Sequence, residues 1–376
     1  MIKVLFVGDA IINSGFSTVT HNICNELSKF VNLEVYGIGY DGTTKNPYPY
    51  HVYPALHDRD IYSFMGITKI IESQHPDVVV LFNDDNIIER YINCIKDTRV
   101  ITLFPINLLP LNTLRMLAFS NPLYNICEVL TYTQFSVDEI KKLNPNLKVN
   151  PIYHGVDYST FFPFEIKDNF LKNKFVVGNV NVNSYRKRLD LFLKGFAKFA
   201  ENKDDVTCIV HSTNKDIAYD LQFITDDLGI TDKVVFSRKN KSFQELNQIY
   251  NLMDVVVNTS IGEGFGLPLL EGAACKKAVL CPEHGNLKDI WGDAATYIKI
   301  KEYEYVYGSS CFGGVIDTDD MANKLTTLYE DRILLKERKE AAFSKAMEPQ
   351  FNWKNVAKLV LESIQRSHKG RPTYIE

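Results

Sequence analysis

The sequence predicts an α/β protein built from two doubly wound parallel sheets. Two series of short apolar, β-branched runs alternate with stretches of helical periodicity, which is typical of parallel sheets covered by helices on both faces. A chain of 376 residues is too long for one typical core, so two domains are expected. The polar stretch from Phe161 to Lys174 separates the two series and contains the expected linker.

The first series opens with the buried strand Val4–Val7 and defines a domain expected over residues 1–165. Its further expected elements are a helix at 15–27, a strand at 33–36, a helix at 61–72, strands at 77–82, 100–104 and 128–132, and a helix at 136–143.

The second series defines a domain expected over residues 166–348. Its expected strands lie at 175–178, 206–210, 234–236, 255–257 and 278–281, and its expected helices at 190–199, 218–228 and 243–252. Ligands of doubly wound sheets bind at the carboxyl ends of the strands, so we expect two facing domains with a cleft between them.

Composition and charge are those of an ordinary globular protein. The chain is 45% hydrophobic and 23% charged, and its net charge of -4 gives no support for a dominant polyanion-binding surface. Seven cysteines, an odd number without a CxxC pair, predict free thiols in a reducing compartment and no structural zinc. No signal peptide or membrane-spanning run is evident, which predicts a cytoplasmic protein. The apolar segment 108–119 could touch a membrane, although a buried helix is the favoured interpretation.

The most informative stretch is Ser260–Glu271, which follows the expected strand at 255–257. Glu263 and Glu271 stand eight residues apart, with the sequence Gly264-Phe265-Gly266-Leu267-Pro268 between them. This order predicts a strand, a tight glycine loop and a helix that begins near Pro268. The amides at such a helix start favour an anion. The alternative is a purely structural role, a glycine turn before a core helix with two solvated glutamates.

This stretch resembles the E-x7-E motif of retaining glycosyltransferases of the GT-B fold, most closely the GT4 family. The resemblance extends loosely over nearly the whole chain and implies transfer of a sugar from a nucleoside diphosphate sugar, such as a UDP-sugar or GDP-sugar. It also implies that residues 349–376 form a crossover helix returning to the first domain, and that no metal or other cofactor is obligatory. The donor sugar, hexose or pentose, is left open.

A run of three cations, Arg186, Lys187 and Arg188, would ordinarily be a solvated face between a strand and a helix. By the resemblance, Lys187 matches a lysine that contacts the donor diphosphate, where positive charge stabilises the leaving group. The family usually has an arginine where this chain has Asn181 or Val182, so Arg186 or Arg188 is expected to supply the second charge.

The resemblance assigns the remaining donor contacts as well. Glu271 would accept hydrogen bonds from the ribose and Glu263 would meet the sugar hydroxyls, which rules out a glycosidase pair. The expected lining of the donor site also includes Gly15, Asn181, His284, Gly264, Phe265, Gly266 and Leu267. The loop at Gly15 lacks a GxGxxG pattern, which counts against a dinucleotide oxidoreductase.

The acceptor side is predicted less sharply. Asn83 and Asp84 follow one expected strand and Asn107 follows the next, so these polar side chains are candidates to touch an acceptor. His154 and His211 are expected to be structural. A glycan, a lipid-linked glycan, a protein and a hydroxylated DNA base all remain possible acceptors, and a catalytically inactive nucleotide-sugar-binding module is the alternative outside catalysis.

Overall fold

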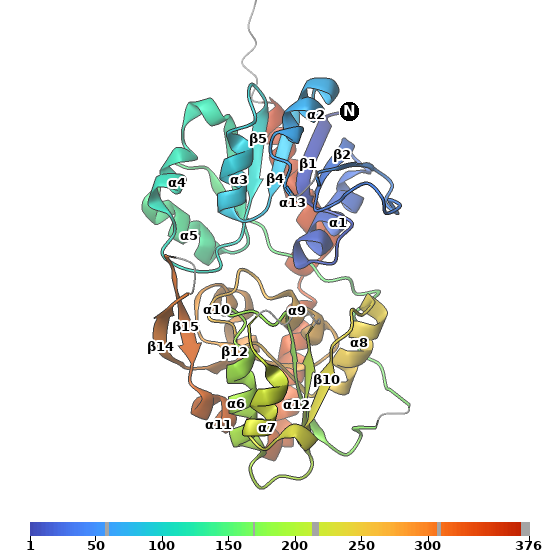
Figure 1. Cartoon of the computed structure of the whole chain (residues 1–376), viewed down its shortest axis with the longest axis vertical. Coiled ribbons are helices and arrows are strands. Elements are labelled where there is room, and N and C mark those ends of the chain that lie inside the picture. Colours follow the sequence, from blue (N-terminus) through green and yellow to red (C-terminus); the bar gives the residue numbers. More distant parts are fainter. Residues whose placement is uncertain (57–59, 168–169, 213–217, 307–309, 370–376) are drawn as a thin grey trace, which may run out of the picture. The chain divides into compact units, whose positions relative to one another are not determined.

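The chain divides into two α/β units in the computed structural model, which describes residues 1–56, 60–167, 170–212, 218–306 and 310–369 (Figure 1). The first unit comprises residues 1–106, 111–155 and 349–376, and the second comprises 107–110 and 156–348. The sequence placed the boundary at residue 165, whereas the division falls between Gly155 and Val156.

The first unit is built on a seven-stranded, fully parallel sheet in the order β3-β2-β1-β4-β5-β6-β7. The strands are β1 (Lys3–Asp9), β2 (Asn32–Ile38), β3 (His51–Pro54), β4 (Val78–Phe82), β5 (Arg99–Leu103), β6 (Ile126–Thr131) and β7 (Val149–Pro151). Strand β4 is buried along its whole length, as the apolar run Val78–Phe82 predicts for a central strand covered on both faces.

The α-helices found in the described residues of the first unit include the C-terminal helix α13. They are α1 (Gly15–Leu27), α2 (Gly66–Gln74), α3 (Asp85–Ile92), α4 (Thr113–Ala118), α5 (Gln134–Leu143) and α13 (Trp353–Lys369). Helix α13, red in Figure 1, lies beside the blue and cyan strands of the first unit. Buried Glu128 on β6 anchors it through Ser363 Oγ and Arg366, each at 2.8 Å.

The second unit repeats the design with a six-stranded parallel sheet in the order β10-β9-β8-β11-β12-β13. Its strands are β8 (Phe175–Val180), β9 (Val206–His211), β10 (Val234–Ser237), β11 (Val255–Val257), β12 (Ala278–Pro282) and β13 (Thr296–Ile298). Its helices are α6 (Leu189–Ala200), α7 (Leu221–Asp227), α8 (Phe243–Leu252), α9 (Leu267–Ala274), α10 (Gly285–Trp291), α11 (Thr318–Glu330) and α12 (Arg332–Ala346). A separate antiparallel hairpin pairs β14 (Ile300–Tyr305) with β15 (Phe312–Ile316).

The predicted fold class is confirmed, and two local expectations are wrong. The helix expected at 61–72 begins only at Gly66, because Ser63 adopts a left-handed φ of 43° and interrupts the turn before it. The buried helix expected at 108–119 is reduced to α4, whose Leu114 is 80% exposed. Residues 107–110 instead run beside the hairpin, where Phe312 N donates to Leu109 O at 2.7 Å.

Each sheet has a switch point, where consecutive crossovers diverge in opposite directions. In the first unit this point lies between β1 and β4, and in the second between β8 and β11. Loops that leave the carboxyl ends of such neighbouring strands open a crevice that binds ligands in doubly wound folds. In the second unit these are the loops that carry Lys187 and Glu263.

Candidate active site

The second unit brings its two most informative loops together at the switch point. Ile261 N donates to Arg186 O at 3.0 Å, which joins the loop after β11 to the loop after β8. Arg186 returns the contact from its side chain, since its guanidinium donates to Gly262 O at 2.6 Å. The backbone therefore holds the cationic run against the glycine-rich loop.

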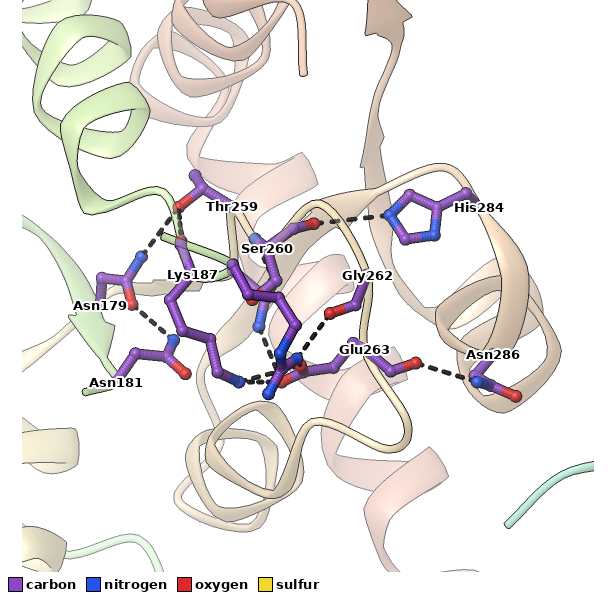
Figure 2. A network of polar contacts seen from close by, with 11 residues as sticks. Asn179, Asn181, Lys187, Thr259, Ser260, Gly262, Glu263, His284 and Asn286 are labelled. Carbon is purple, nitrogen blue, oxygen red and sulfur yellow. Dashed lines mark hydrogen bonds and ion pairs between the residues drawn. The ribbon is translucent and has the colours of Figure 1, made fainter. Parts of the chain in front are cut away.

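A buried ion-pair cluster lies at this junction (Figure 2). Lys187 Nζ lies 2.6 Å from Glu263 Oε1 and 2.9 Å from Oε2. Arg186 donates to the same carboxylate at 2.5 Å. Lys187 and Glu263 are only 8% and 5% exposed, so two cations and one anion are concentrated where water is largely excluded. The cluster carries a local positive charge of one.

The surroundings of Glu263 and Lys187 shift the pKa values of both groups. Burial alone would raise the pKa of Glu263, but Lys187 and Arg186 outweigh it and lower the value to about 2. Burial lowers the pKa of Lys187 to about 8, although Glu263 opposes that shift. Both groups are therefore ionised at neutral pH, and the lysine would lose its proton far more readily without its carboxylate.

Two asparagines hold the glutamate in place. Asn258 Nδ2 donates to Glu263 Oε1 at 3.4 Å, and Asn286 Nδ2 donates to the Glu263 carbonyl at 2.9 Å. Figure 2 shows Asn286 reaching this carbonyl from α10, on the side away from Lys187. The carboxylate thus has fixed partners on its side chain and on its backbone, which preorganises the site.

A series of hydrogen bonds between polar side chains also holds the backbone of the cationic run. Thr259 Oγ1 lies 3.0 Å from both Lys187 O and Arg188 O, and it accepts from Asn179 Nδ2 at 3.4 Å. Asn181 Nδ2 donates to Asn179 Oδ1 at 2.8 Å (Figure 2). Asn181, one of the two residues expected where the family usually has an arginine, is thus a neutral member of this hydrogen-bond series.

Arg188 is directed to other partners. It binds Asp190 at 3.0 Å and Glu304 of the hairpin at 3.2 Å, and it starts α6 with a left-handed φ of 49°. Of the two candidates for a second charge, Arg186 therefore lies in the cluster with Lys187, whereas Arg188 is engaged by two carboxylates.

The glycine loop leads directly into α9. Gly266 has a φ of 85°, a conformation that favours glycine, and Pro268 occupies the first turn as predicted. Gly264 and Phe265 are buried, and Leu267 is the first helical residue. His284 caps α10 nearby, with Nε2 3.5 Å from Ser260 O. Gly264, Phe265, Gly266 and Leu267 thus lie at the start of α9, and His284 contacts the same loop through Ser260 O.

Glu271 has a very different environment from Glu263. It lies on α9, partly exposed, and accepts from the phenol of Tyr250 at 2.7 Å. In the described part of the chain no cation pairs with it, and burial raises its pKa to about 7. The pKa values of the two glutamates of the motif are therefore shifted in opposite directions, which their spacing did not predict.

The first unit groups its polar candidates at its own switch point. Asn83 Nδ2 donates to Asp9 Oδ1 at 3.2 Å, and Ser14 Oγ donates to Asp9 Oδ2 at 2.8 Å. Burial raises the pKa of Asp9, although the hydrogen bonds from Ser14 and Asn83 act to lower it. Asp84 precedes α3, and Gly15 is the exposed first residue of α1, whose position would leave open space around a Cβ.

Asn107 does not share this setting. It belongs to the second unit, where a Cβ built on Gly262 would lie 2.1 Å from its carbonyl oxygen. The three acceptor-side candidates are therefore divided between the units, Asn83 and Asp84 in the first and Asn107 in the second.

The two histidines expected to be structural lie in packed surroundings. His154 is 3% exposed, with its ring 4.0 Å from that of Tyr132, and burial lowers its pKa to about 3. His211 Nδ1 lies 2.9 Å from Ser237 Oγ.

Residues 162–345 match the family described as "Glycosyl transferases group 1". This matched stretch lies within the second α/β unit. An O-antigen chain mannosyltransferase, RfbU of Salmonella typhimurium, is 28% identical over 172 residues, which cover 45% of this chain and 46% of that protein. The chain thus spans less than half the length of this relative.

Solved structures extend the likeness to the whole chain. A glycosyltransferase from Rickettsia africae superposes with a TM-score of 0.78 at 15% identity, covering 98% of this chain and 99% of that one. Anabaena HepE in complex with UDP-glucose superposes with a TM-score of 0.74 at 16% identity, covering 97% of this chain and 100% of that one. The chain has the GT-B fold, and the stretch that is similar to the glycosyl transferases group 1 family belongs to its second α/β unit.

Several residues of the candidate site were not predicted from the sequence. Asn258 and Thr259 follow β11 directly, so their position at a strand end could have indicated them. Asn286 and Tyr250 carry no such sign, because each reaches the site from a helix that the motif does not include.

Proposed function

We propose that this protein transfers a sugar from a nucleoside diphosphate sugar to a hydroxyl acceptor with retention of the anomeric configuration. The observation that carries the proposal is the Lys187–Arg186–Glu263 cluster beside the start of α9. A buried lysine, a half-buried arginine and a helix N-terminus suit a diphosphate that gains charge as it leaves. The group 1 family match and the UDP-glucose bound by HepE, a protein of the same fold, support a nucleotide sugar as donor.

In the proposed reaction the bond between the anomeric carbon and the donor phosphate oxygen breaks, and a bond to the acceptor oxygen forms on the same face. The acceptor proton passes to the departing phosphate oxygen, so no side chain is required as a base. Lys187 and Arg186 stabilise the charge on the diphosphate, while Glu263 orients both cations and accepts from a sugar hydroxyl. Glu271 accepts from the ribose.

The test is a donor screen on the purified chain. We expect UDP or GDP to raise the melting temperature, and one UDP-, GDP- or ADP-sugar to be turned over, slowly to water in the absence of acceptor. NMR of the first sugar released would show the anomer of the donor. A Lys187→Met protein serves as the control for site specificity. No thermal shift with either nucleotide and no turnover of any donor would contradict the proposal.

A catalytically inactive binding module is the second candidate, and one observation favours it. Asn181 stands where the family usually has a cation, and its amide is engaged with Asn179. A thermal shift with nucleotide sugars but no turnover of any of them would support the module.

We propose a glycan, lipid-linked glycan or protein hydroxyl as acceptor in preference to a modified DNA base. The basic run 238–241 is the second patch that DNA could use, but Lys241 pairs with Glu245 at 2.9 Å and Arg238 stacks on Phe236. Binding to DNA with hydroxylated bases that weakens steeply as salt rises would overturn this preference.

A further inference from the structure

A single phenol holds the second glutamate of the motif. Tyr250 on α8 and Glu271 on α9 lie 21 residues apart, and the Tyr250 hydroxyl donates to Glu271 Oε2 at 2.7 Å. Tyr250 is fully buried, whereas Glu271 is partly exposed. The contact therefore fixes one carboxylate oxygen from the core side of the helix.

The phenol is itself held rigidly. Its ring packs edge-on against Phe161, with centroids 5.9 Å apart, and Phe161 packs in the same way on Phe243. One turn earlier on α8, Asn247 accepts at 3.0 Å from the thiol of Cys275, the residue that follows α9. Two polar contacts one turn apart thus set the register of α8 against α9, and burial with the contact to Phe161 holds the Tyr250 ring in place.

No opposite charge assists the ionised form of Glu271 in the described part of the chain. Burial dominates its pKa and raises it to about 7, and the hydrogen bond from Tyr250 works in the other direction. The titratable groups on the elements around it include Cys275, Lys276 and Lys277 directly after α9, Cys281 on β12, Glu245 on α8, Asp254 before β11, and Lys339 and Glu340 on α12. Glu245 pairs with Lys241. Lys339 pairs with Asp254, Glu340 with Lys276, and Lys277 Nζ donates to Asn251 O.

We propose that Tyr250 is a positioning residue for donor binding, which holds one oxygen of Glu271 so that the other is presented to the donor ribose. The assignment rests on the proposed function, because Glu271 has a ribose to bind only in that reaction. A hydrogen bond to one oxygen orients the carboxylate plane and favours its ionised form, which is the better acceptor for two ribose hydroxyls.

The first arm of the test measures the carboxylate without any ligand. Glutamate labelled with ¹³C at the carboxyl carbon is introduced into the full chain, and the Glu271 resonance is assigned by its loss in Glu271→Gln. Tyr250→Phe should raise the midpoint of its titration by about one pH unit, because a charge-assisted hydrogen bond is lost. Tyr297→Phe on β13 removes a phenol that donates to Gly292 O, and it should leave the midpoint unchanged.

The second arm measures the affinity for UDP, and for GDP if UDP does not bind, between pH 5.5 and 9. Wild-type affinity should fall about tenfold per pH unit below the Glu271 midpoint. In Tyr250→Phe this fall should begin about one unit higher, with affinity near that of the wild type at pH 9. An equal loss at every pH would indicate a merely structural role and overturn the inference.

The two failures are distinguishable. If the wild type binds a nucleotide and Glu271→Gln weakens it, but Tyr250→Phe leaves both midpoints unchanged, then the positioning role is wrong while the proposed function stands. If the wild type binds neither nucleotide, the proposed function fails and the ribose role of Glu271 fails with it, whatever the titration shows.

Discussion

Lys187 Nζ bridges both carboxylate oxygens of Glu263, at 2.6 and 2.9 Å, although the two residues lie 76 positions apart. The pair joins the loops that leave β8 and β11, which are neighbours in the sheet but not in the chain. A lysine expected to meet phosphate and a glutamate expected to meet sugar are thus one electrostatic unit. Each charge offsets part of the free-energy cost of burying the other.

Replacing Glu263 should destabilise the second unit. Glu263→Gln leaves Lys187 buried beside Arg186 without a counter-charge, and we expect a loss of about 3–5 kcal/mol in the free energy of unfolding. Urea unfolding followed by circular dichroism measures this. Glu302→Gln, on the exposed strand of the hairpin, should cost almost nothing. A Glu263→Gln protein as stable as the wild type would show that the pair contributes no net stability.

The decrease in stability at acid pH should also depend on the ion pair between Lys187 and Glu263. The pKa of Glu263 is lowered from its ordinary value to about 2, so its stabilising contribution is present above about pH 4.5 and is lost as the pH falls towards 2. Between these values the unfolded chain binds the extra proton. Glu263→Gln should lack this component, and its stability should decrease less steeply over that range than that of the wild type.

Removing the lysine charge should affect turnover more than donor affinity. Lys187→Met retains the buried stem but loses the cation that stabilises the leaving diphosphate, so we expect kcat to fall about 10²–10³-fold with a smaller change in KM. Lys198→Met, which breaks an exposed pair with Asp319, is the control. A rise in KM with kcat unchanged would assign Lys187 to ground-state binding instead.

Replacing Glu271 should weaken donor binding and leave acceptor binding unchanged. Glu271→Ala removes the acceptor expected for the ribose, and we predict a rise in donor KM of about tenfold or more, with little change in acceptor KM. Steady-state kinetics with varied donor and varied acceptor separate the two, and Glu330→Ala at the exposed end of α11 is the control. Unchanged donor affinity would refute the assigned role.

Two glycines offer a matched test of backbone packing. A Cβ at Gly262 would lie 2.1 Å from Asn107 O and 2.5 Å from a Leu108 methyl, so Gly262→Ala should displace this segment and cost about 1–3 kcal/mol. Nothing lies within 4 Å of a Cβ at Gly15, so Gly15→Ala should unfold like the wild type. A fall in nucleotide affinity for Gly15→Ala without loss of stability would place a ligand beside that loop.

The amino-acid sequence by itself determined the repeating strand and helix pattern, because buried parallel strands require continuous β-branched runs such as Val78–Phe82 and Val255–Val257. It also indicated the local form of the glycine loop, since glycine favours the left-handed φ of 85° found at Gly266, and proline favours the first turn of a helix, where Pro268 lies. The positions of Lys187, Glu263 and Glu271 after strand ends followed from the same pattern.

Only the tertiary structure decided which of these residues meet. The strand order at the switch point sets β8 beside β11, and this places Lys187 and Arg186 on Glu263 while Arg188 turns to Asp190. Packing of α8 on α9 brings Tyr250 to Glu271, and the pairing of Leu109 with Phe312 moves residues 107–110 into the second unit. These contacts depend on distances between elements remote in the chain, and no local residue preference encodes them.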